Sequence, residues 1–268
     1  MTPLRDRIWR GARAERLRAS LVLGPGIRIA DLGCGRGELG AVLAASGATV
    51  HGFDADPEQV EAGRARNLAG VRFEEADARS VPADDGAFDR VVCQALLVHQ
   101  GHPEDVVAEM VRLVRPGGLV AALEPLPPVF GDGELGALRT ERWQAAADRA
   151  KDAGLGSWRV GDELAERFAA AGIEPVDGWR EEGRWRLEPG DDAFRDLLLE
   201  LASGDAAEAE TLRWLAGEAG MAVERLDTLD RLEAVERQSR LAELRRGQRT
   251  EEGSYPLAVF VGRRPASV

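Results

Sequence analysis

The residues best placed for chemistry lie in one glycine-rich turn, Gly33-Cys34-Gly35-Arg36-Gly37, which joins an apolar run to a helix-like segment. Glycine permits positive φ angles and a close approach of a ligand to the backbone, and the first N–H groups of a helix are free to bind that ligand. The pattern therefore predicts a cofactor-binding turn. A dinucleotide fingerprint counted from Gly33 needs a third glycine where the chain has Glu38, so the sequence disfavours NAD and FAD.

Acidic residues accompany successive apolar runs. Asp31 lies in the run before the turn, and Asp54 ends the next run, His51-Gly52-Phe53-Asp54. A carboxylate at Asp54 can accept hydrogen bonds from both hydroxyls of a ribose. Its alternative role is to cap the following helix, but Asp56, directly before Pro57, is better placed for that. The sequence therefore favours a nucleoside contact at Asp54.

The elements that must position these residues alternate between short apolar runs and helix-like segments from residue 27 to residue 124, which indicates βα units around a mostly parallel sheet. The predicted strands are Ile27–Leu32, Ala48–Phe53, Val71–Glu75, Phe88–Leu96 and Leu119–Glu124, and the predicted helices lie near residues 38–46, 57–68 and 103–114. Arg115-Pro116-Gly117-Gly118 has proline and glycine where a type II turn prefers them, so it predicts a turn into the fifth strand.

The glycine turn and its acidic residue resemble motif I of the class I S-adenosylmethionine methyltransferases, an acidic residue followed by GxGxG. Asp31, Gly33, Gly35 and Gly37 match this motif position by position. The resemblance implies a Rossmann-like α/β fold with a central, mostly parallel seven-stranded sheet, here carrying a helical cap or insert. It also implies that the turn passes under the methionine part of the cofactor and that Asp31 helps to hold the cofactor's amino group.

The same resemblance implies the rest of the cofactor site. Asp54 matches the ribose-binding acid of the family. Asp77 matches the residue that accepts from the adenine amine, with the N–H of Ala78 facing a ring nitrogen; the alternative for Asp77 is a polar turn residue. Ala55 and Gln94 complete the predicted set. The implied cofactor is S-adenosylmethionine, with S-adenosylhomocysteine as its product. The specific resemblance covers residues 27–124.

The acceptor is expected beyond the carboxyl ends of the strands, where open α/β sheets bind their ligands. His99, after the fourth strand, is the best candidate for a catalytic base, because imidazole titrates near neutral pH. Its alternative role is to cap a turn or line the pocket. Glu124, at the end of the fifth strand, either serves the acceptor as a binding group or base, or anchors a turn.

Five tryptophans outside the core segment can stack on a planar substrate or fill the protein interior. They are Trp143, Trp158, Trp179, Trp185 and Trp214.

Beyond residue 124 the alternation stops. The sequence predicts a loop-rich lid at 125–158, a helix at 162–171, strands at 174–179 and 183–187, helices within 191–246 and a last strand at 255–261. The predicted organisation is an N-terminal helix in 1–26 packing near the cofactor site, a core formed by 27–190 and 251–268, and a helical insert at 191–250. Position and length suggest that the lid and the insert recognise the acceptor.

Composition narrows the class of partner and the setting. A net charge of −12 over 268 residues disfavours nucleic acid, which needs a wide positive surface. No apolar run is long enough to span a membrane, and the basic N-terminus lacks the apolar stretch of a signal peptide. Two cysteines without CxxC or histidine spacing form neither a disulfide framework nor a zinc site, so we expect a cytoplasmic protein without a metal. A homodimer is left open.

The sequence therefore predicts an enzyme that transfers a methyl group from S-adenosylmethionine to an oxygen, nitrogen or carbon atom of a small metabolite. Three alternatives remain. The first is a methyltransferase acting on protein or RNA, the second is a non-methylating protein that binds S-adenosylmethionine, and the third keeps the cofactor but performs another reaction, such as decarboxylation or cyclisation.

Overall fold

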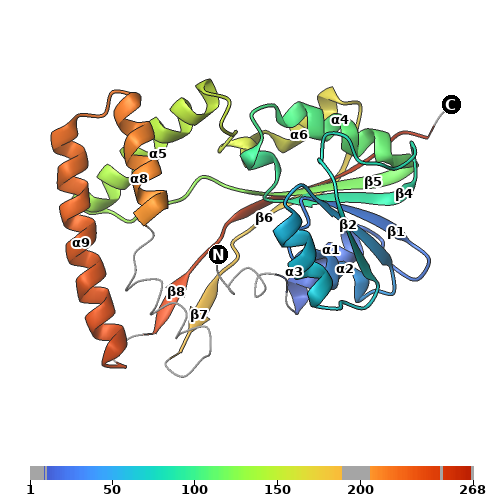
Figure 1. The fold of residues 1–268 in the computed structure, drawn as a ribbon, viewed down its shortest axis with the longest axis horizontal. Coiled ribbons are helices and arrows are strands. Elements are labelled where there is room, and N and C mark those ends of the chain that lie inside the picture. The colour runs from blue at the N-terminus through green and yellow to red at the C-terminus, as the bar shows by residue number, and fades with distance from the viewer. Residues whose placement is uncertain (1–8, 10, 189–205, 248–249, 267–268) are drawn as a thin grey trace.

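Seven strands form one sheet in the order β3-β2-β1-β4-β5-β9-β6 (Figure 1). The computed structural model describes residue 9 and residues 11–188, 206–247 and 250–266. The strands are β1 (Arg28–Leu32), β2 (Thr49–Asp54), β3 (Val71–Glu75), β4 (Phe88–Gln94), β5 (Val114–Pro125), β6 (Glu174–Glu181) and β9 (Leu257–Arg263). The first five are parallel, and β9 lies antiparallel between β5 and β6. The expected mostly parallel seven-stranded sheet is confirmed.

Helices cover both faces of this sheet. They are α1 (Ala12–Ser20), α2 (Glu38–Ala44), α3 (Pro57–Ala65), α4 (Pro103–Leu113) and α6 (Val160–Ala170), with a short 3₁₀ turn, η2 (Leu97–His99). Figure 1 shows α4 and α6 on one face and α1, α2 and α3 on the other. The predicted cap of α3 is confirmed, because Asp56 Oδ1 accepts a hydrogen bond from the N–H of Glu58 at 2.8 Å.

The turn predicted before the fifth strand appears as an excursion within β5. Val114 pairs with Phe88 and Leu119 pairs with Arg90, so the residues 115–118 bulge out of the ladder between them. Gly117 has a φ of 75°, which suits the third position of a type II turn. The bulge lets β5 begin directly where α4 ends.

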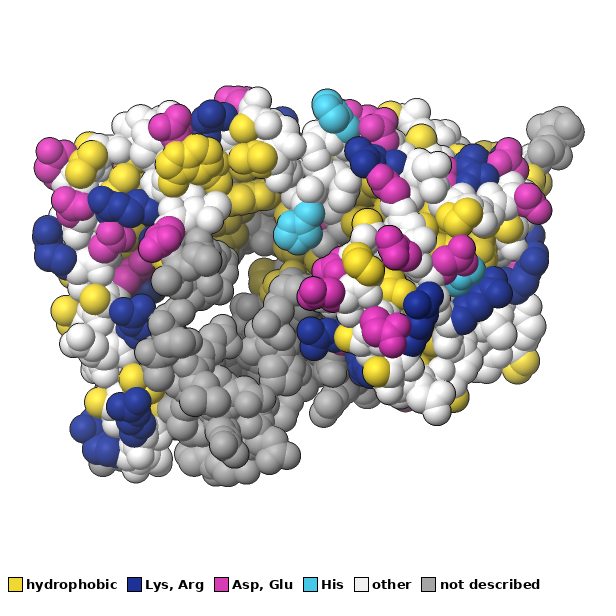
Figure 2. All heavy atoms as spheres, in the orientation of Figure 1, with side chains coloured by type: hydrophobic (Ala, Val, Ile, Leu, Met, Phe, Trp, Pro, Cys, Tyr) yellow, Lys and Arg dark blue, Asp and Glu magenta, His cyan; other side chains and the backbone are white. Residues whose placement is uncertain are grey.

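A helical unit stands beside the sheet and consists of α5 (Gly133–Asp152), α8 (Ala206–Glu218) and α9 (Val223–Arg245) (Figure 1). Its small core includes Leu138, Leu215 and Leu229. The partly buried carboxylate of Glu233 on α9 accepts two hydrogen bonds, each of 3.0 Å, from the guanidinium of Arg142 on α5. Figure 2 shows the surface hollowed between the helical unit and the sheet, with hydrophobic side chains along the edge of the hollow.

The loop structure predicted for 125–158 is wrong, because α5 occupies twenty residues of it, while the role of this segment as a lid stays a prediction. The buried face of α5 is formed largely by small residues, Gly136 and the alanines at 146, 147 and 150. Such a face gives little of the large apolar periodicity by which helices are predicted. The predicted helices after residue 205 are present as α8 and α9, whereas 191–205 lie outside the described residues.

A two-stranded ribbon, separate from the main sheet, pairs β7 (Trp185–Leu187) with β8 (Glu251–Gly253). The strand at 183–187 was expected and β8 was not. Within the described residues, no helix has both the length and the apolar character that crossing a membrane requires.

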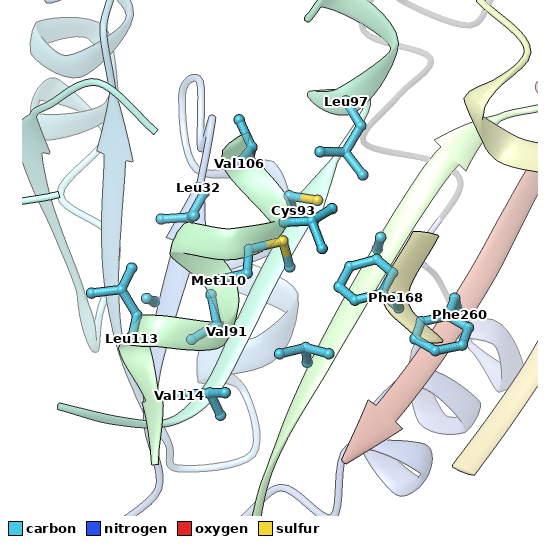
Figure 3. Packing of buried hydrophobic residues seen from close by; sticks show 14 of the residues in the cluster. Leu32, Val91, Cys93, Leu97, Val106, Met110, Leu113, Val114, Phe168 and Phe260 are labelled. Atoms are coloured by element: carbon cyan, nitrogen blue, oxygen red, sulfur yellow. The ribbon is translucent and has the colours of Figure 1, made fainter. Parts of the chain in front are cut away.

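The core lies on both faces of the sheet. β4 and β5 are buried along most of their length, as parallel strands between two helical layers must be. Figure 3 shows Met110 of α4 packed over Val91 and Cys93 of β4. Phe168 of α6 stacks on Phe260 of β9 with ring centroids 4.8 Å apart. This packing fixes the strand ends at which the candidate site lies.

Candidate functional site

The glycine turn bends at three residues with positive φ, 66° at Gly33, 52° at Gly35 and 81° at Gly37. A Cβ atom at Gly33 would lie 2.8 Å from Leu96 Cδ1, and a Cβ atom at Gly37 would lie 2.5 Å from Phe73 Cζ. Both distances are shorter than real Cβ contacts. Gly33 and Gly37 therefore need glycine for space as well as for conformation.

Backbone hydrogen bonds fix this turn against the end of β2. The N–H of Gly33 donates to the carbonyl oxygen of Phe53 at 2.8 Å. The N–H of Gly35 donates to Asp54 Oδ2 at 2.8 Å, and the N–H of Asp56 donates to Asp54 Oδ1 at 3.0 Å. Asp54, which the sequence predicts as the ribose contact, thus also holds the glycine turn. Each of its oxygens retains a second lone pair for a further hydrogen bond.

Asp31, near the end of β1, is a buried carboxyl group. Its exposed fraction is 1%, and Oδ2 has no hydrogen-bond partner among the described residues. Burial raises the pKa of Asp31 to about 8, and the carboxylates of Asp54 and Glu38 add to the rise. A cation beside a buried carboxyl group favours its ionised form. This position therefore favours a positively charged group of a ligand.

A cavity of about 80 Å³ opens beside this carboxyl group. Its lining residues are Asp31, Gly33, Cys34, Gly35, Glu38, Leu39 and Gln94. Four of the residues predicted to bind the cofactor, Asp31, Gly33, Gly35 and Gln94, thus meet at one cavity. It lies between the ends of β1 and β4, where the strand order reverses and where open α/β sheets bind ligands.

Trp9 is a residue of this site that the sequence did not single out. Its Nε1 donates to Gln94 Oε1 at 2.9 Å, and its side chain is 4% exposed. The bond fixes the Gln94 amide, which lines the cavity. Because Trp9 and Gln94 are 85 residues apart in the chain, no local sequence pattern predicts the contact.

The structure does not bring the other predicted cofactor residues onto this cavity. Gly37, Asp54, Ala55, Asp77 and Ala78 are absent from the described lining. The carboxylate of Asp77 instead accepts hydrogen bonds from the backbone N–H and the guanidinium of Arg79, which lowers the pKa of Asp77. This contact corresponds to the alternative role of Asp77, that of a polar turn residue. Asp77 remains a prediction as an adenine contact.

Glu124 anchors the turn that follows β4. It is fully buried; Oε1 accepts from the N–H groups of Leu96 and Leu97, both at 3.0 Å, and Oε2 accepts from that of Val98 at 3.1 Å. Burial raises the pKa of Glu124 to about 7, against the effect of these hydrogen bonds. Of the roles left open by the sequence, the geometry supports the turn anchor. Through η2, Glu124 sets the position of His99.

His99 lies at the edge of a second cavity, of about 660 Å³. This acceptor cavity, as we name it, is bounded by η2, the segment after β5, α5, α8 and the segment before β9. Its side chains include Val98, His99, Leu126, Trp143, Trp158 and Tyr255. The N–H of Ser157 donates to the carbonyl oxygen of Val98 at 3.0 Å and thereby ties the loop after α5 to η2.

Two of the five tryptophans considered for stacking, Trp143 and Trp158, line the acceptor cavity. Trp214 on α8 is 54% exposed and does not line it. Trp179 on β6 packs under the guanidinium of Arg16, whose Cζ lies 4.2 Å from the ring centroid. The side chain of Trp185 lies outside the described part of the chain.

The other two histidines lie away from both cavities. The ring of His51 on β2 bonds Glu74 at 2.9 Å and Arg72 at 2.8 Å. Burial, followed by the charge of Arg72, lowers the pKa of His51. His102 is exposed before α4 and lies 3.3 Å from Glu104. Neither histidine is among the described residues that line the two cavities. No group of three His, Cys, Asp or Glu side chains within the described residues is placed to hold a metal ion.

Residues 29–118 match the family model described as "Methyltransferase domain". This part of the chain is therefore similar to methyltransferase domains. The matched region contains β1 to β4, the start of β5, the glycine turn, Asp31 and η2. Outside the match are the helical unit and most of the wall of the acceptor cavity.

A curated methyltransferase is similar to this chain over a longer segment than the family match. Over 128 residues the chain is 38% identical to demethylmenaquinone methyltransferase of Clavibacter sepedonicus, a match that covers 46% of this chain and 50% of the relative. The chain thus spans about half the length of the curated relative. The similarity supports the kind of domain, while the activity and substrate of the whole protein are matters for proposal.

Two solved structures share the fold over nearly the whole chain. The [4+2]-cyclase SpnF is 21% identical, covers 98% of this chain and 81% of its own, and has a TM-score of 0.56. A geranyl diphosphate methyltransferase in complex with S-adenosylmethionine is 18% identical, covers 94% of this chain and 84% of its own, and has a TM-score of 0.52. At these identities the likeness shows the fold, which is the Rossmann-like fold of class I methyltransferases.

Proposed function

We propose that the protein transfers a methyl group from S-adenosylmethionine to an oxygen, nitrogen or carbon atom of a small metabolite. The proposal is supported by the similarity of residues 29–118 to methyltransferase domains and by the relative that carries a methyltransferase name. It is further supported by two cavities at the carboxyl ends of the parallel strands, one beside the glycine turn and one beside His99.

The observation that carries the proposal is the unpartnered, buried Oδ2 of Asp31 on the cavity of the glycine turn. S-adenosylmethionine carries an ammonium group and a sulfonium group, and either one supplies the positive charge that a buried carboxylate lacks. A flavin ring supplies none, and a dinucleotide turn would need a third glycine where the chain has Glu38. The residues present therefore fit the sulfonium cofactor.

The remaining cofactor residues are proposed from the family motif. Asp54, with Ala55 beside it, would accept from the ribose hydroxyls through its free lone pairs. Asp77 and the N–H of Ala78 would meet the adenine, and the positive φ at Gly37 lets the turn pass close to the cofactor. When bound, the cofactor supplies an electrophilic methyl group on sulfur.

His99 is the proposed base on the acceptor side. Its imidazole lies at the acceptor cavity, where it can take the proton that an attacking hydroxyl or amine loses. Glu124 positions this histidine by holding the three N–H groups at the start of η2. A carbon acceptor without a proton to lose needs no such base.

The setting of the reaction is also part of the proposal. A net charge of −12 supports a small acceptor over a nucleic acid, and the two free cysteines, Cys34 and Cys93, agree with a reducing cytoplasm. The homodimer and the independence from metal stay predictions. The role of the helical unit in recognising the acceptor is proposed from its place on the cavity wall.

Transfer of labelled methyl groups tests the proposal. Full-length protein is incubated with S-adenosylmethionine carrying a radioactive methyl group and a whole-cell extract, which is then separated by size. We expect label in the small-molecule fraction, and none with Asp31→Asn, while the exposed-acid control Asp105→Asn transfers label normally. Label only in protein or RNA would favour the macromolecular alternative. Cofactor consumption without methyl transfer would favour decarboxylation or cyclisation.

A further inference from the structure

The acceptor cavity has aromatic walls on several sides. Trp143 of α5 and Trp158, which precedes α6, reach it from one region of the chain, and Tyr255, which precedes β9, reaches it from another. Tyr255 is the single tyrosine of the sequence, in which aromatic residues (Phe, Trp and Tyr) make up 5%. Flat indole and phenol rings offer apolar faces against which a planar molecule stacks.

The same cavity has no charged side chain among the described residues that line it, although 31% of the chain is Asp, Glu, Lys or Arg. By contrast, a groove of about 750 Å³ over β2 and β3 has charged side chains in its lining, including Arg28, Arg72 and Glu74. A phosphate or carboxylate that entered the acceptor cavity would lose hydration and would meet no Arg or Lys among these lining residues.

A cation in contact with the wall, Arg159, is already paired. Arg159 lies over Trp143, with Cζ 5.8 Å from the ring centroid, and its guanidinium is 3.2 Å from the carboxylate of Asp148. It therefore does not give the cavity an unbalanced positive charge. The remaining polar groups at the wall include the imidazole of His99 and the hydroxyls of Thr211 and Ser254, which can orient a neutral ligand through hydrogen bonds.

We propose that the acceptor cavity binds an uncharged, planar and largely apolar ring compound as the methyl acceptor. This inference rests on the proposed methyl transfer and names the substrate class. A cavity of about 660 Å³ suits a molecule of two or more rings, and a mostly apolar wall with a few polar groups is typical of such sites. The size also excludes a folded protein or an RNA strand from the cavity itself.

The position of the cavity agrees with this role. Gln94, at the end of β4, lines the cavity of the glycine turn, whereas Val98 and His99, four and five residues later, line the acceptor cavity. The turn held by Glu124 therefore joins, along the chain, residues that line the two cavities.

Two probes of equal shape and different charge test the proposal. 2-Naphthol is uncharged at pH 7, and 2-naphthoate has the same two rings with a carboxylate. Calorimetric titration of the full-length protein should show that 2-naphthol binds at least tenfold more tightly than 2-naphthoate. Equal affinity, tighter binding of the anion or no binding of either probe would overturn the proposal.

Matched variants assign this binding to the cavity. Trp143→Leu should weaken 2-naphthol binding about tenfold, because it removes a stacking face, while Trp214→Leu on the exposed side of α8 should not. Thr211→Arg adds a cation to the wall and should strengthen 2-naphthoate binding at least fivefold. Ala209→Arg, outside the lining, should leave it unchanged. Unaltered naphthol binding by Trp143→Leu would also overturn the proposal.

Binding of S-adenosylhomocysteine, measured on the same samples, separates the two levels of the account. If that compound binds and label still enters small molecules while the naphthol results fail, the substrate class is wrong and methyl transfer stands. If S-adenosylhomocysteine does not bind to the folded wild type, methyl transfer itself is wrong.

Discussion

Binding of S-adenosylmethionine should release a proton from Asp31. Burial raises the pKa of this carboxyl group to about 8, so at pH 7 about nine in ten cofactor-free molecules hold it protonated. The cation of the cofactor favours the ionised carboxylate. The complex should therefore release close to one proton per bound cofactor at pH 7.

The same linkage fixes the direction and size of the pH effect on affinity. Because the pKa in the free protein is raised, the ionised form that binds becomes scarcer as the pH falls below about 8. Each pH unit below it changes the cost of ionising Asp31 by about 1.4 kcal/mol, a factor of about ten in affinity. Affinity should therefore rise about tenfold from pH 6 to pH 7, a range in which the amino group of the cofactor is largely protonated.

Calorimetry in two buffers of different ionisation enthalpy measures the released proton directly. The observed heat at pH 7 should differ between the buffers by nearly one ionisation enthalpy per cofactor. Asp31→Asn should bind weakly and show neither the proton release nor the pH dependence, whereas Asp105→Asn should behave as the wild type. Equal heats in both buffers, together with an affinity that is flat from pH 6 to pH 7, would refute the role given to Asp31.

Three further predictions concern single positions. As the pH rises from 5 to 8, Asp31→Asn should become more stable than the cofactor-free wild type, by several degrees in Tm. The reason is that the folded wild type, in which the pKa of Asp31 is about 8, loses stability between the unfolded pKa of this acid and that value. A Tm difference that is independent of pH in thermal unfolding would contradict this. Gly33→Ala should lower Tm and should also weaken S-adenosylhomocysteine binding at least tenfold, since Gly33 has a φ of +66° and a Cβ there would meet Leu96. The control Gly24→Ala, with open space around it, should change neither Tm nor this affinity. Glu124→Gln should leave the N–H of Val98 unpaired at a cost of about 1–3 kcal/mol and lower kcat, with the affinity for S-adenosylhomocysteine changed less than twofold; an unchanged kcat would show that η2 does not depend on this anchor.

The sheet and the glycine turn were predictable because their signals are local. Buried parallel strands appear as short apolar runs, and the turn needs glycine at Gly33 and Gly37 for space and for conformation. The helix α5 was missed because the residues it buries are largely small ones such as Ala146 and Ala150, which leave little periodic trace. Its preceding prolines and glycines indicated a loop.

The candidate site was predictable only in part, because much of it is built by contacts between distant segments. Trp9 reaches Gln94 across 85 residues. Glu124 accepts hydrogen bonds from backbone N–H groups. Because nearly every residue has such a group, the sequence gives no sign of this contact. The acceptor cavity joins segments from residue 98 to residue 256, so the selection of Trp143 and Trp158 from five tryptophans required the fold.

The central claim is that the glycine turn and Asp31 hold a sulfonium nucleoside whose ribose contacts Asp54. Calorimetric titration of the folded, full-length protein with S-adenosylhomocysteine and S-adenosylmethionine tests it most directly. The account predicts saturable binding of one molecule per chain, weakened at least tenfold by Asp54→Asn for both compounds and by Asp31→Asn for S-adenosylmethionine. The absence of binding heat with either compound on folded wild-type protein would contradict it.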